Sequence, residues 1–173
     1  PSEAVVVKAS WHRAQFGIEL PVYDTDDESL RQRLALNADE GWGTGQRLAD
    51  PGPEEIYSVE LPNGQRYRLA GLHIMSKELD RWQWISLWWS DQPDTDFGED
   101  RPATMAALGA PWGHYKMCTA TFFDERDPAA GGDFDGDAPS LAAALAAVNS
   151  GVGAPSWCSN PYIEDGPHNM ATN

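Results

Sequence analysis

A tryptophan-rich stretch at residues 65–90 constrains the fold more than any other part of the chain. Its first half alternates as a β-strand does, and one face of that strand would carry Tyr67, Leu69, Gly71, His73 and Met75. Its second half would carry Trp82, Trp84, Ser86 and Trp88 on one face and Gln83, Ile85, Leu87 and Trp89 on the other. Neither of these faces is consistently polar, so we expect the second strand to be covered on both sides. The residues between the halves, 76–80, lack the Asn-Gly pair of a minimal turn, which predicts a hairpin with a longer loop.

Further strands are predicted around this hairpin. Three stretches have the β-branched and aromatic character of strands, namely residues 3–11, 55–61 and 112–123. A fourth, at residues 18–23, is interrupted by Pro21 and is typical of an edge strand. The Asn63-Gly64 pair before the hairpin predicts a tight turn, so we expect three successive strands to form an antiparallel meander.

Helices are few in the predicted fold. The alanine-rich residues 140–149 are the clearest helix, and residues 24–36 offer Asp and Ser caps for one or two helical turns. Residues 37–53 are rich in Gly, Pro and polar side chains, and residues 91–102 are acidic, so both are predicted to be loops. The whole pattern predicts a mainly β protein, an antiparallel β-sandwich of jelly-roll-like form with one or two short helices.

Length and charge limit the classes of function. With 173 residues, 41% of them hydrophobic, the chain is predicted to form one domain, residues 1–173, with an extended tail from about residue 155. The net charge of −15 repels phosphate and anionic lipid, which disfavours nucleic acids as partners. No run reaches the roughly 18 apolar residues that a membrane-spanning helix needs, so we expect no membrane insertion.

The two cysteines, Cys118 and Cys158, are compatible with one disulfide or with two buried thiols. The acidic, Trp-rich and Lys-poor composition favours an extracytoplasmic location, periplasmic or secreted. That location in turn favours the disulfide.

Three carboxylates at alternate positions, Asp133, Asp135 and Asp137, resemble the start of a calcium-binding loop. The remainder of that pattern fails, because Ala138-Pro139 stands where the obligatory Gly turn should follow. A solvated acidic loop is therefore the favoured interpretation, and a calcium site is the alternative.

One histidine has a specific chemical alternative to a structural role. The four histidines lack the short spacings of zinc sites, but His73 would share a strand face with Met75 beside the Trp-rich strand. His and Met are the usual axial ligands of haem iron. A hydrogen-bonded structural histidine is the competing interpretation.

No catalytic motif is present in the sequence. It has no Gly-x-Ser-x-Gly elbow, no phosphate-binding glycine loop and no His-Glu-x-x-His helix, so we expect a protein that is not an enzyme. A hydrolase with an acidic cleft remains an alternative, since paired carboxylates abound. The eight Trp suggest another alternative, a carbohydrate-binding module that stacks sugars on Trp82, Trp84 and Trp88. The competing explanation is a Trp-filled core, and at most two of the four Trp in the hairpin can be exposed.

Three segments of the sequence form a pattern of their own: HIMSKELDRWQWISLWW at residues 73–89, PWGHYKMC with FFDERDP at residues 111–128, and WCSNPYIEDGPHNMATN at residues 157–173. They resemble, in this order, segments of a group of secreted bacterial proteins that are labelled cytochrome c-like. The resemblance covers about the C-terminal two-thirds of the chain. In that group, the tail similar to SNPYIE…ATN leads directly into a Cys-x-x-Cys-His haem-attachment motif.

This chain contains no Cys-x-x-Cys-His up to Asn173, so haem c is expected only if such a segment follows. The resemblance implies a non-catalytic, extracytoplasmic domain of a cytochrome c-like protein, which serves electron transfer or acts as a redox scaffold. Its partner would be a redox protein or a small ligand, and His73 would be the distal ligand of a haem packed against the domain.

Overall fold

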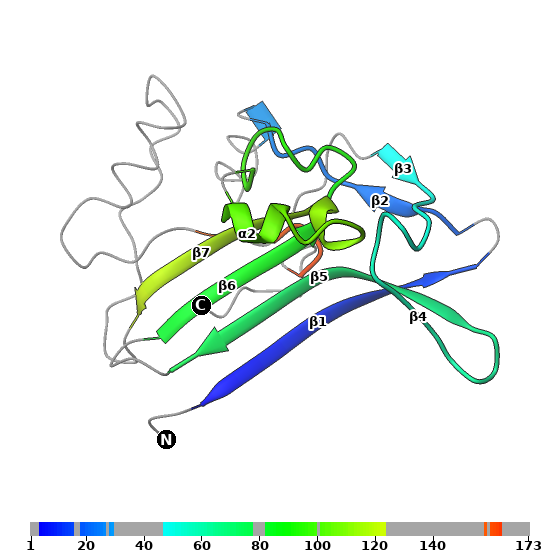
Figure 1. Ribbon diagram of the computed structural model, residues 1–173, viewed down its shortest axis with the longest axis horizontal. Helices are drawn as coiled ribbons and strands as arrows, with labels where there is room; N and C mark the ends of the chain where they lie inside the picture. The colour runs from blue at the N-terminus through cyan, green and yellow to red at the C-terminus, as the bar shows by residue number, and fades with distance from the viewer. Residues whose placement is uncertain are drawn as a thin grey trace.

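A computed structural model describes eight parts of the chain (Figure 1): residues 4–15, 18–26, 28–29, 47–77, 82–99, 101–123, 158 and 160–163. The predicted helix at residues 140–149 lies outside these parts. So do most of the predicted tail and the three aspartates Asp133, Asp135 and Asp137.

A five-stranded antiparallel sheet forms the centre of the fold. Four strands lie in the order β1 (Val5–Ala14), β5 (Arg66–Ser76), β6 (Trp82–Trp89) and β7 (Tyr115–Phe123), and β4 (Ser58–Glu60) also pairs with β5. The β5–β6 pair confirms the predicted hairpin, with Gly71 opposite Trp88 and Met75 opposite Trp84. The mainly β, antiparallel class with short helices is confirmed as well.

The predicted meander is wrong in one respect. Strand β1 pairs with β5 along its whole length, from residue 66 to residue 76. Strands β4 and β6 must therefore share the other edge of β5, where β4 pairs with residues 66–68 and β6 with residues 71–76. As a result, β4 and the first part of β5 form a hairpin that extends beyond β6 (Figure 1). The turn of this hairpin contains Gly64 at a φ of 78°, as the Asn-Gly pair predicts.

A β-bulge at Ala70 determines which side chains share a face of the sheet. Ser10 pairs with Gly71 and Trp11 with Leu69, so Ala70 has no partner in β1. The extra residue reverses the alternation of β5, and Tyr67 and Leu69 lie on the opposite face from Gly71, His73 and Met75. The sequence alone placed all five on one face.

The main sheet has two faces, which differ in the side chains that they carry. The disulfide face carries Gly71, His73, Ser86, Trp88 and Cys118, which are linked by direct cross-strand pairing. The aromatic face carries Trp11, Leu69, Leu72, Trp89 and Tyr115.

A two-stranded sheet of β2 (Leu20–Val22) and β3 (Arg47–Ala49) adds a second layer. Leu20 and Val22 are each 1% exposed, so this short strand is buried although it contains Pro21. Strand β3 lies in a region predicted to be a loop. Its Arg47 forms ion pairs with Asp24 and Asp91, and these contacts between distant segments are absent from a local sequence pattern.

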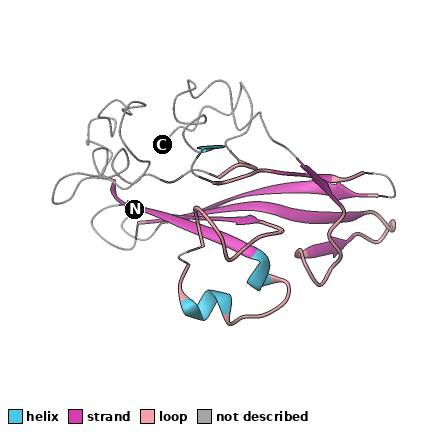
Figure 2. Cartoon of the chain, turned by 90° about the horizontal axis from the view of Figure 1, so that it is seen from above, coloured by secondary structure: helices cyan, strands magenta, loops and turns pink. Residues whose placement is uncertain are grey.

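The connection from β6 to β7 contains a short helix α2 (Ala103–Ala106) and a 3₁₀ turn η2 (Trp112–His114). Both lie on one side of the main sheet (Figure 2), and the Trp112 ring contacts Tyr115 of the aromatic face. The acidic loop in the same connection, predicted to be a surface loop, also enters the core: Phe97 stacks on Trp88 with ring centroids 5.5 Å apart.

Candidate functional site

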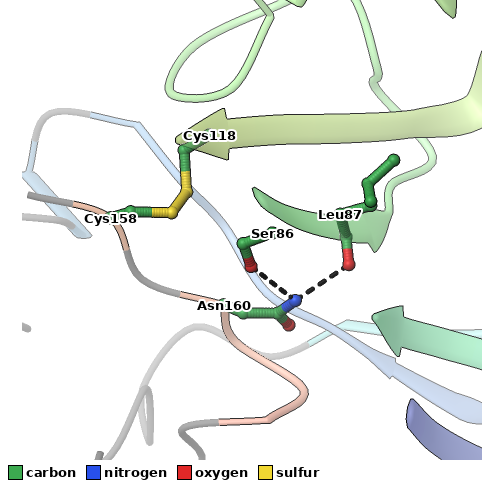
Figure 3. Close-up of a disulfide and its surroundings, with 5 residues drawn as sticks. All are labelled: Ser86, Leu87, Cys118, Cys158 and Asn160. Atoms are coloured by element: carbon green, nitrogen blue, oxygen red, sulfur yellow. Dashed lines mark hydrogen bonds between the residues drawn. A yellow bond between two sulfur atoms is a disulfide. The ribbon is translucent and has the colours of Figure 1, made fainter. Parts of the chain in front are cut away.

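A disulfide between Cys118 of β7 and Cys158 confirms the predicted pairing, with the two Cα atoms 5.6 Å apart (Figure 3). It attaches Cys158, which is 40 residues further along the sequence, to the disulfide face. A bond of this kind is compatible with an extracytoplasmic location.

Asn160 fixes the same segment to β6 two residues after the disulfide. Its Nδ2 donates to Ser86 Oγ at 3.0 Å and to the Leu87 carbonyl at 2.8 Å (Figure 3). Its Oδ1 accepts from the backbone N–H of Tyr162 at 3.0 Å. The side chain is fully buried, so its amide has exchanged water for these three partners.

Gly71 allows this segment to lie directly on β5. A Cβ at residue 71 would be 2.9 Å from Asn160 Oδ1 and 3.1 Å from both Ile163 Cγ1 and Tyr162 Cβ. Any larger residue would push residues 160–163 away from the sheet. The glycine is therefore required by a close approach.

His73 lies two residues further along β5 on the same face. It belongs to a cross-strand row with Lys8 of β1, Ser86 of β6 and Cys118 of β7. Burial, with a smaller contribution from the charge of Lys8, lowers the pKa of His73 to about 4. The imidazole is therefore neutral at neutral pH, which is the form that binds a metal.

Met75 and Trp84 form the next cross-strand pair on this face. His73 and Met75 stand on the same side of one strand, about 7 Å apart along it, and the two axial ligands of an iron approach from opposite sides. At most one of them can therefore bind a given haem iron. The indole Nε1 of Trp84 is buried and has no acceptor among the residues that the structure describes.

The three Trp predicted to stack on sugars have different positions. Trp88 is 1% exposed and fills the core against Phe97, so it offers no ring face to a ligand. Trp84 is partly buried, and the side chain of Trp82 lies outside the described part of the structure. The sequence predicts that this strand is buried on both sides. That burial, and not the number of Trp in the strand, decides whether a ring can stack on a sugar.

An aromatic cluster that the sequence did not reveal lies on the opposite face. It consists of Trp11, Tyr57, Trp112 and Tyr115, which come from β1, the residue before β4, η2 and β7. Successive ring centroids are 6.2, 5.1 and 5.2 Å apart. No local pattern could have indicated it, because Trp11, Tyr57 and the Trp112–Tyr115 pair come from three stretches far apart in the sequence.

Acidic and metal-binding side chains in the described ranges were compared with the groupings that a metal site or a hydrolase needs. There, no group of three or more His, Cys, Asp or Glu side chains gathers around one point. Asp24 and Asp91 lie close together, but both bind Arg47 and so form no free carboxylate pair of the kind that hydrolysis needs.

No protein-family model matches the chain, and neither the curated proteins nor the solved structures include a match to it. In the described part of the chain, no helix is long and apolar enough to cross a membrane.

Proposed function

We propose that the chain is a non-catalytic, extracytoplasmic domain of a cytochrome c-like protein, whose disulfide face packs against a haem c group or a redox partner. The domain would serve electron transfer or act as a scaffold for it. The observation that carries the proposal is the position of His73, a neutral imidazole on the face to which Cys158 and residues 160–163 are attached.

Part of one of the segments that carry the sequence resemblance lies on the disulfide face. Cys158 and residues 160–163 belong to the tail that, in the similar proteins, leads into the haem-attachment motif. Cys158 is bonded to Cys118, and Cys118 shares a cross-strand row with His73. The described part of this tail therefore lies on the face that carries His73.

The chemical types of the side chains on this face support the proposal. His73 offers a ring nitrogen that is not protonated at neutral pH, and Met75 offers a thioether sulfur. Trp84 offers a buried N–H that lacks an acceptor among the described residues and could donate to a haem carboxylate. A bound haem c would supply one-electron chemistry. The residues of the chain would hold it, exclude water from it and occupy one iron position.

The proposal can be tested with a haem c peptide that carries its own Cys-x-x-Cys-His and has an open sixth iron position. We expect the oxidised protein to convert the peptide to a low-spin form, with a saturable shift of the Soret band. His73→Ala should abolish this shift. Met75→Leu shows which of the two side chains binds the iron, because it leaves the Soret shift unchanged if the ligand is His73 and not Met75.

His114→Ala is the matched control. His114 lies in η2, immediately before β7 and outside the cross-strand row of His73 and Cys118, and its backbone carbonyl keeps the bond to Ser90 N–H in the variant. It should behave as the wild type does. An absent Soret shift, or a shift that persists in His73→Ala, would contradict the proposal.

A further inference from the structure

The aromatic cluster exposes two rings side by side. Trp11 is 41% exposed and Tyr57 is 38% exposed, with ring centroids 6.2 Å apart. Large aromatic rings are normally buried, and contiguous exposed ones mark binding surfaces. This pair lies on the aromatic face, away from His73, so an inference from it is independent of the function proposed above.

The rings behind this pair hold it rigidly. Trp112 stacks on Tyr57 at 5.1 Å with an interplanar angle of 23°, and Tyr115 packs behind Trp112. Tyr115 is fully buried. Its hydroxyl donates to the Leu69 carbonyl at 2.7 Å and accepts from Tyr57 N–H at 3.1 Å. The exposed rings are therefore preorganised, which lowers the entropy cost of binding a ligand.

We propose that Trp11 and Tyr57 bind a single chain of a neutral polysaccharide by stacking against its sugar rings. The apolar C–H faces of a sugar match an aromatic ring, and its hydroxyl groups match a polar rim. Arg13 supplies such a rim: it is exposed and lies on the same face of β1 as Trp11. The chain's net charge of −15 disfavours acidic polysaccharides.

The angle between the rings selects the form of the polysaccharide. The planes of Trp11 and Tyr57 are tilted by 56°. Two rings tilted in this way cannot both lie flat on a crystalline surface. They can both contact a single chain whose successive sugars are rotated relative to one another. Soluble polysaccharides are therefore the expected ligands, and crystalline ones are excluded.

Affinity gel electrophoresis tests this site with three soluble neutral probes: laminarin, hydroxyethyl cellulose and galactomannan. We expect at least one to retard the protein, and Trp11→Ala to weaken this binding about tenfold, which corresponds to about 1.4 kcal/mol. Tyr57→Ala should act in the same direction. Trp11→Phe, which keeps a ring, should retain most of the affinity.

Leu48→Ala and Leu108→Ala are the matched controls, because these side chains are 63% and 61% exposed at other places. They should leave the retardation unchanged. Unaltered melting temperatures would establish that the Trp11 variants fold.

The proposal is overturned if no probe retards the protein or if the alanine variants bind as the wild type does. Equal binding to crystalline cellulose would overturn the single-chain assignment. All these variants should leave the haem-peptide titration unchanged, so failure of one proposal is distinct from failure of the other.

Discussion

Replacing Gly71 by Ala tests whether residues 160–163 lie directly on the disulfide face. The new methyl group would be 2.9 Å from Asn160 Oδ1 and 3.1 Å from both Ile163 Cγ1 and Tyr162 Cβ. Asn160 cannot turn away freely, because its amide also binds Ser86, Leu87 and Tyr162. The segment must shift instead, and some of these hydrogen bonds must weaken.

The size of the effect follows from three terms. Overpacking a fitted site costs about 1–3 kcal/mol, and a weakened buried hydrogen bond adds about 1 kcal/mol. The reduced entropy of the unfolded chain offsets about 0.4–1 kcal/mol. We therefore expect Gly71→Ala to lower the free energy of unfolding by about 1–3 kcal/mol. Gly52→Ala is the matched control, since its methyl group would meet nothing closer than Glu55 Oε2 at 3.8 Å.

Urea unfolding of the oxidised proteins measures these differences. Asn160→Ala removes the atom that the new methyl group meets most closely, so the double variant should cost about 1 kcal/mol less than the sum of the single variants. A Gly71→Ala variant as stable as Gly52→Ala would refute the close approach. So would strict additivity with Asn160→Ala.

Two further predictions concern the same face. Reduction of the Cys118–Cys158 disulfide should lower stability by about 4 kcal/mol on the chain-entropy model, given its separation of 40 residues. Urea unfolding with and without reductant checks this, and the Cys118→Ala, Cys158→Ala double variant should not respond to reductant. His73 has a native pKa of about 4 against 6.5 for the free side chain, so the unfolded state binds more protons between these values and stability is lost as the pH falls from 6.5 to 4. Because the side chain is only half-buried, we expect a loss of about 1–2 kcal/mol. The stability difference between wild type and His73→Gln at pH 7 and pH 4.5 measures it, and a difference independent of pH would contradict it.

The sequence predicts the strands well where alternation is local. The β5–β6 hairpin, its burial on both sides and the Gly64 turn all follow from residues adjacent in the chain. The bulge at Ala70 does not, because it depends on how β1 pairs with β5. Strand β3 was also missed, since it is held by ion pairs of Arg47 with distant aspartates.

In the candidate sites too, some features were predictable from the sequence, and others depend on contacts between distant segments. The Cys118–Cys158 pair was predictable, because the chain has only two cysteines. The roles of the tryptophans were not, because exposure depends on what packs over each ring. Trp88 is covered by Phe97, whereas Trp11 gains its partner Tyr57 from another strand region.

The most direct test of the central claim is to locate the haem on the protein. Paramagnetic broadening of amide signals in ¹H–¹⁵N spectra, recorded with a ferric haem c peptide, reports which face it contacts. We predict broadening centred on residues 71–75, 84–88 and 160–163, and its loss in His73→Ala. Broadening centred on Trp11 and Tyr57, or the same pattern in His73→Ala, would contradict it.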